Sequence, residues 1–88
     1  MFALKIEHRV TDNLFRAIVL KIEQIEGQEQ PCLSVHAIAE CSDIDVAIDL
    51  ACKDITATHV YTYGQAPFIP ENLSVRETAK AFAFIVEG

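Results

Sequence analysis

The chain has 88 residues, of which 51% are hydrophobic and 23% are charged, with three glycines and three prolines. This composition supplies apolar surface for one small core and excludes intrinsic disorder, so we expect a single globular domain over residues 1–88. Thirteen acidic residues against seven basic ones give a formal net charge of −6, the wrong sign for a surface that binds the phosphate backbone of a nucleic acid.

The compartment is predicted from the first residues and from the cysteines. Charges at Lys5, Glu7 and Arg9 interrupt the region where a secretion signal needs a continuous apolar core. No stretch approaches the ~18 consecutive apolar residues of a membrane span. The three cysteines are odd in number and lack paired spacing, which is typical of reduced thiols. We therefore expect a cytoplasmic protein that binds neither membranes nor nucleic acids.

The first third of the chain predicts a β-hairpin. Residues 2–10 alternate between apolar and polar side chains, as a strand with one buried face does, and residues 11–13 have turn chemistry. Residues 14–26 fit two patterns, because a helix leaves Leu20 on its polar side and a strand leaves Arg16 on its apolar side. The β-branched content and the flanking turn signals favour a long strand.

The middle of the chain predicts a strand, a helix and another strand. Residues 32–40 alternate, with Leu33, Val35, Ala37 and Ala39 assigned to one face. Ser42 is then expected to cap a helix. The apolar stripe of this helix comprises Ile44, Ala47, Ile48, Ala51 and Ile55. Residues 56–63 are rich in β-formers and predict the next strand.

The last element is predicted to be a helix from residue 75 to about 87, because Ser74 and Glu77 have the spacing of a capping box. The element order then gives a two-layer α+β sandwich, in which a mostly antiparallel sheet of about four strands carries two helices on one face. If residues 14–26 are helical, the order becomes β-α-β-α-β-α and the sheet becomes more parallel.

The cysteines and histidines suggest two kinds of chemistry, metal binding and thiol reactivity. Cys32 and His36 share a strand face but lie ~13 Å apart at ~3.3 Å per residue, too far to share a zinc ion, so we expect no metal and no cofactor. Cys41 precedes the predicted helix cap and is a candidate reactive thiol, since helix amino termini lower thiol pKa values. The simpler interpretation makes Cys41 a small buried apolar residue.

The strand ending at residue 63 places His59, Tyr61 and Tyr63 on one face, where amphipathic rings in a row suit an interface. The alternative is that the tyrosines pack at the edge of the core and His59 is merely exposed. A long connection over residues 64–73 follows, stiffened by Pro67 and Pro70. The candidate binding or interface residues are His59, Tyr61, Tyr63, Phe68 and Phe84.

Apolar residues opposite the buried stripes of the helices favour self-association. Phe84 falls opposite the stripe of the last predicted helix, as do Val46 and Leu50 on the earlier one, so we predict a homodimer. Common cofactor and hydrolase signatures are absent, which argues against an enzyme without excluding an unfamiliar site. The leading hypothesis is a non-catalytic protein-interaction or regulatory module. The alternative is a small-molecule-binding or enzymatic domain with a cleft near His59, Tyr61, Tyr63 and residues 64–73.

Overall fold

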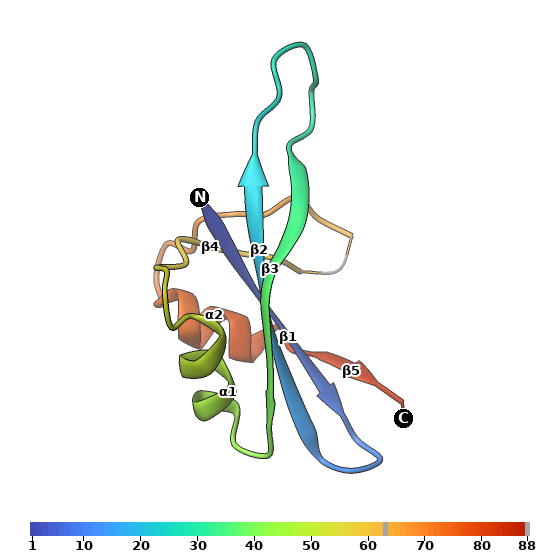
Figure 1. Ribbon diagram of the computed structural model, residues 1–88. Coiled ribbons are helices and arrows are strands. Elements are labelled where there is room, and N and C mark those ends of the chain that lie inside the picture. Colours follow the sequence, from blue (N-terminus) through green and yellow to red (C-terminus); the bar gives the residue numbers. More distant parts are fainter. Residues whose placement is uncertain (63, 88) are drawn as a thin grey trace.

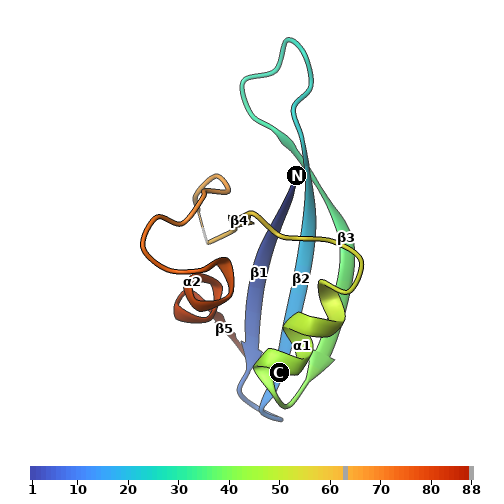
Figure 2. The same ribbon diagram turned by 90° about the vertical axis from the view of Figure 1, so that its left-hand side faces the viewer.

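The computed structural model describes residues 1–62 and 64–87, and these residues form a five-stranded sheet and two helices (Figure 1). The elements in chain order are β1 (Phe2–Arg9), β2 (Leu14–Glu23), β3 (Cys32–Cys41), α1 (Ile44–Ala51), β4 (His59–Val60), α2 (Val75–Ala81) and β5 (Phe84–Val86). The sheet order is β3-β2-β1-β4, and β5 also pairs with β1. Both helices lie on one face of the sheet, which confirms the predicted α+β sandwich (Figure 2).

β1 and β2 form the predicted antiparallel hairpin. Leu4 pairs with Val19 and Ile6 pairs with Ala17, and all four side chains are almost completely buried beneath the helices. The turn between the strands includes Asn13 with φ of 54°, in the left-handed region that asparagine tolerates better than most residues. The hairpin therefore fixes which side chains of both strands enter the core.

The ambiguous segment 14–26 is a strand over Leu14–Glu23, as its β-branched content favoured. This strand lies in the middle of the antiparallel part of the sheet, with β1 on one side and β3 on the other. Two neighbouring strands satisfy its backbone groups on both edges, and both of its faces carry apolar residues. Arg16, the residue that fitted the strand pattern poorly, lies on the face turned away from the helices, where it forms ion pairs.

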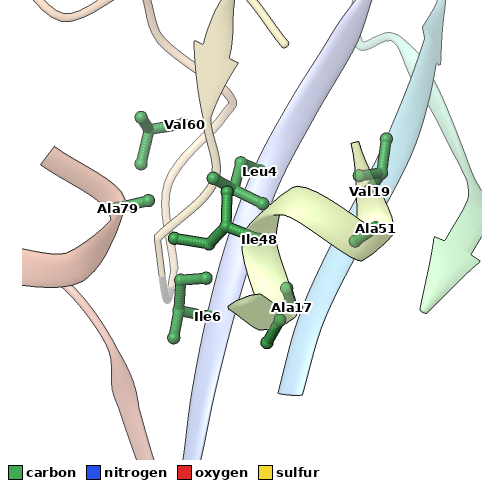
Figure 3. Close-up of a cluster of buried hydrophobic side chains, with 9 residues drawn as sticks. Leu4, Ile6, Ala17, Val19, Ile48, Ala51, Val60 and Ala79 are labelled. Atoms are coloured by element: carbon green, nitrogen blue, oxygen red, sulfur yellow. The ribbon is translucent and has the colours of Figure 1, made fainter. Parts of the chain in front are cut away.

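The core fills the space between the sheet and the two helices. Figure 3 shows that its side chains come from β1, β2, β4 and both helices. The cluster comprises Leu4, Ile6, Ala17, Val19, Ala47, Ile48, Ala51, Val60 and Ala79. Small residues on the helices allow them to approach the sheet closely, whereas β1 supplies two of the larger side chains.

Helix α1 begins one residue later than the sequence predicted. The N-cap is Asp43 rather than Ser42, because the Asp43 carboxylate accepts hydrogen bonds from the backbone amides of Asp45 and Val46 at 2.9 and 3.2 Å. An aspartate at this position satisfies two otherwise unpaired amides and interacts favourably with the helix dipole. The predicted apolar stripe is correct up to Ala51, with Ala47 and Ile48 buried, but Ile55 lies beyond the end of the helix.

Ion pairs join the two helices on their solvent side. Asp45 accepts hydrogen bonds from Arg76 at 3.0 Å and from Lys80 at 3.2 Å, and Arg76 also donates to Asp49. The hydrogen bond from Arg76, with a second from Lys80, lowers the pKa of Asp45 below its ordinary value. These bonds fix which side of α1 faces α2.

The predicted final helix is too long. α2 ends at Ala81, and residues 84–86 form β5, which pairs in parallel with Glu7, His8 and Arg9 of β1. The reason lies in the sheet. β4 pairs only with Ala3 and Leu4, so without β5 the rest of this edge of β1 would have unpaired backbone groups. Phe84 is therefore a strand residue, and its predicted position on a helix was wrong.

Candidate functional site

The face of the sheet turned away from the helices is called the outer face. Leu4 and its β4 partner Val60 point into the core, so Ala3 and its partner His59 project from the outer face. Following the strand pairing from this point assigns the other residues. They are Lys5, Glu7 and Arg9 of β1, Leu14, Arg16, Ile18, Leu20 and Ile22 of β2, Leu33, Val35, Ile38 and Glu40 of β3, and Phe84 and Val86 of β5.

One end of the outer face is charged. Glu7 pairs with Lys5 at 3.2 Å and with Arg16 at 3.4 Å, and Glu40 pairs with both Arg16 and Arg9 at 3.4 Å. Asp12 also pairs with Arg9 at 2.9 Å, so three carboxylates balance the three basic side chains of the network. This end therefore offers no net charge to attract an anion or a cation.

The other end of the outer face is apolar and is interrupted by a β-bulge in β3. Val19 pairs with Ala37 but the next residue, Leu20, pairs with Val35, so His36 is the extra residue. The bulge places Val35 and Ile38 on the outer face, with 60% and 55% of their surface exposed. The predicted alternation, which kept Val35 on one face with Ala37, was therefore wrong.

Strand β3 is an edge strand of the sheet, and the side of β3 that faces away from β2 is called the free edge. No strand within residues 1–62 and 64–87 pairs with this side. The amide of Ile22 donates to the carbonyl of Met1 at 2.8 Å, so even-numbered residues of β2 direct their backbone groups to β1 and odd-numbered ones to β3. By alternation, the backbone groups that point to the free edge belong to Leu33, Val35, Ile38 and Glu40.

The predicted His–Tyr stripe is partly described. His59 lies on the outer face but is only 9% exposed, and its Nδ1 lies 2.8 Å from the Thr58 hydroxyl, so the alternative of a merely exposed histidine was wrong. Tyr61 is half-buried, and the Lys5 ammonium lies 5.7 Å from its ring centroid. Tyr63 lies outside the described residues. The interface role of these residues stays a prediction.

The two predicted phenylalanines lie apart. The Lys5 ammonium is 5.1 Å from the ring centroid of Phe84, which places this phenylalanine on the outer face with Tyr61. Phe68 instead forms an isolated bridge to Val60, packs against the core, and meets Phe82 edge to face at 6.3 Å. Only Phe84 therefore shares a surface with the stripe.

A hollow of about 300 Å³ lies where the connection after β4 approaches the loop before β3. It is open to solvent, and it is lined by Gln30, Pro31, Leu33, Tyr61, Gln65 and Pro67 among others. Aromatic and proline side chains give it apolar walls, and the two glutamines supply hydrogen-bonding groups. Tyr61 and residues 64–67 of the predicted cleft line this hollow whereas His59 does not, and the binding role of the cleft stays a prediction.

The thiols differ in their surroundings. Cys41 is the last residue of β3, is half-buried, and packs against the core, while the amides of the following helix start are bonded by Asp43. Cys32, at the other end of β3, is exposed. Burial raises the pKa of the Cys52 thiol above its ordinary value. No group of three or more metal-binding side chains occurs within the described ranges.

Comparisons of the chain with protein-family models, with curated proteins and with solved structures gave no match. None of the helices in residues 1–62 and 64–87 is long and apolar enough to cross a bilayer. The function is therefore inferred from the outer face, the free edge and the hollow beside Tyr61.

Proposed function

We propose that the protein is a non-catalytic, self-associating interaction module of the cytoplasm. The observation that carries the proposal is the free edge of the ten-residue strand β3, along which Leu33, Val35, Ile38 and Glu40 direct backbone groups outward beside the exposed side chains of Val35 and Ile38. A strand from another molecule satisfies such backbone groups by extending the sheet, and it buries the adjacent apolar side chains at the same time.

The composition of β3 supports association rather than protection. Monomeric proteins commonly guard edge strands with lysine, proline or several charges. β3 contains no lysine and no proline, and its only charged residue is Glu40, whose carboxylate already pairs with Arg9 and Arg16. A β-bulge at His36 interrupts the strand and places Val35 and Ile38 on the same face.

The cytoplasmic part of the proposal depends on the cysteines. All three are free in the structure, and a reducing compartment keeps such thiols reduced. Counting the free thiols of the protein taken from freshly lysed cells, with and without a reducing agent, tests this part. Three titratable thiols are expected, and an intramolecular disulfide in the cellular protein would contradict the assignment.

Sedimentation velocity and light scattering of the full chain, from low to high micromolar concentration, test self-association. A mass that rises from 9.8 kDa towards twice that value is expected. A chain that remains monomeric at every concentration would refute the proposal.

Two variants show whether any association uses the free edge. Val35→Lys places a charge at the edge, and Ile69→Lys is the matched control because Ile69 is 65% exposed in the connection before α2. The first is expected to lower the mass and the second to leave it unchanged, with circular dichroism showing that both variants fold.

The hollow beside Tyr61 favours a second function, the binding of a small apolar molecule. Its volume of about 300 Å³ is at the lower end of the range of small-molecule sites. Ligand-observed NMR with mixtures of cellular metabolites tests this candidate, with Tyr61→Ala as the control. Binding that survives the substitution would remove the hollow from consideration.

A further inference from the structure

We propose that two copies of the chain pair their β3 strands antiparallel along the free edges, about a twofold axis at the His36 bulge, with Cys32 of each copy opposite Cys41 of the other. This inference rests on the proposed self-association and names the surface and the register that carry it. The occupant of the free edge is therefore a second copy of this chain.

The pairing register follows from the sequence of β3 on the two sides of the bulge. In a twofold interface, residue i meets residue j of the second copy and j meets i. With His36 and Ala37 taken together as the centre, three of the four flanking pairs match in kind: one is β-branched with β-branched, one is small with small, and one is cysteine with cysteine. The opposed pairs are Val35 with Ile38, Ser34 with Ala39, Leu33 with Glu40, and Cys32 with Cys41.

The backbone directions agree with this register. Leu33, Val35, Ile38 and Glu40 direct their amides and carbonyls to the free edge, and in the proposed register each of them meets another member of this set. These are hydrogen-bonded pairs of an antiparallel ladder. A register shifted by one residue would oppose outward-pointing to inward-pointing backbone groups and would lose the bonds.

The side chains on the outer face add apolar contact at the axis. Val35 and Ile38 are 60% and 55% exposed in the single chain, and each would lie beside the other type from the second copy. Cross-strand pairs of β-branched residues stabilise antiparallel sheets. The central pairs are therefore the ones that bury the most exposed apolar surface.

Helix α1 carries a second apolar strip along the same edge. Asp45 and Asp49 face α2, and Ile48 faces the sheet, so Val46 and Leu50 lie on the flank of α1 that points away from α2. Because α1 packs on β2 and β3 whereas α2 packs on β1 and β4, this flank adjoins the free edge (Figure 2). Val46 and Leu50 are 43% and 54% exposed. Apolar side chains thus border the edge on both faces of the sheet.

Charge does not oppose the pairing of two acidic copies. The chain carries −6 overall, but within β3 only Glu40 is charged, and Arg9 and Arg16 neutralise it in its own copy. Leu33 would meet Glu40 of the second copy, where the aliphatic part of the glutamate offers apolar contact. Self-complementarity of the strand and local neutrality together favour a second copy over an unrelated peptide.

Cys32 and Cys41 allow the proposed register to be tested by disulfide formation. Cys32 and Cys41 point their backbone groups inward, so they form a non-hydrogen-bonded pair across the interface, with Cα atoms ~4.5 Å apart. This separation lies within the range of ~4.4–6.8 Å that a disulfide spans. Within one chain the two cysteines stand at opposite ends of β3, about 30 Å apart at ~3.3 Å per residue, so a bond between them has to join two copies.

The experiment is mild oxidation of the full chain with diamide, which accepts the two protons and two electrons that each pair of thiols releases when its S–S bond forms. Non-reducing electrophoresis and mass spectrometry of the digested dimer then identify the bond. A Cys32–Cys41 peptide pair in a dimer band is expected. Cys32→Ser and Cys41→Ser should each remove it, and Cys52→Ser should retain it as the matched control.

Sedimentation of the reduced protein separates this inference from the proposed function. A dimer that gives no Cys32–Cys41 bond, or that joins Cys32 to Cys32, refutes this register and leaves self-association standing. A monomer refutes both, and a monomer that binds an unrelated strand peptide at β3 shows a different occupant. Val35→Lys is expected to weaken dimerisation at least about tenfold and to remove the cross-link, whereas Ile69→Lys should retain both.

Discussion

Two substitutions on helix α1 separate what the core contributes from what the free edge contributes. Ile48 is 2% exposed and belongs to the core cluster, whereas Leu50, two residues later on the same helix, is 54% exposed. Ile48→Ala and Leu50→Ala each remove part of an aliphatic side chain from the same helix and replace it with a good helix former. The pair therefore differs mainly in burial.

The expected magnitudes follow from that difference. Ile48→Ala removes buried atoms and leaves a cavity between the helix and the sheet, at a cost of about 2–5 kcal/mol in the free energy of unfolding. A domain of 88 residues has a total stability of about 4–13 kcal/mol, so this loss is a large fraction of it. Leu50→Ala removes atoms that are already half in water and should cost no more than about 0.5 kcal/mol in the monomer.

Urea unfolding monitored by circular dichroism, at a concentration low enough for the monomer to dominate, measures both values. Near-equal losses for the two variants would refute the assignment of Ile48 to the core and of Leu50 to the surface. Repeating the measurement at high concentration adds a second comparison, because dimerisation stabilises the folded chain by mass action. Leu50→Ala should then lose part of the concentration-dependent gain.

Three further outcomes are expected. The pKa of Asp45 is lowered, so its carboxylate stabilises the fold fully at pH values above its ordinary pKa of 3.8 and loses that contribution as the pH falls through the pKa of the folded state. Asp45→Asn should therefore lower the melting temperature at neutral pH but have little effect in strong acid. Equal effects at both pH values would contradict the pairing of Asp45 with α2. Cys52 should react with iodoacetamide more slowly than exposed Cys32 at neutral pH, because burial raises its pKa, and equal rates by mass spectrometry would be inconsistent with the fold. Asn13→Ala should cost about 1 kcal/mol in urea unfolding because φ is 54° at this turn, and Asn13→Gly should cost less; the reverse order would contradict the turn geometry.

The two functional candidates occupy different parts of the molecule. The proposed self-association uses the free edge of β3 with Val35 and Ile38, whereas the hollow beside Tyr61 lies where the connection after β4 meets the loop before β3. Leu33 belongs to both, because it lines the hollow and directs its backbone to the free edge. A ligand in the hollow that alters dimer affinity would therefore indicate contact through Leu33.

Local patterns in the sequence were sufficient for most of the secondary structure. Alternation predicted β1, β-branched content favoured a strand at β2, and the serine at Ser74 predicted the start of α2, where its hydroxyl accepts a hydrogen bond from the amide of Glu77. These features depend on neighbours within a few residues, so one chain segment contains all the information that they need. The order of elements and the α+β class followed from them.

The remaining features depend on contacts between distant segments. β5 forms because β4 is too short to occupy the whole edge of β1, which no pattern around Phe84 reveals. The bulge at His36 is defined by pairing with β2, and it alone places Val35 and Ile38 on the same face. Periodicity states which residues are apolar, but the facing strand decides their register. The free edge was therefore visible only once the sheet order was known, although the near absence of charge in β3 was present in the sequence throughout.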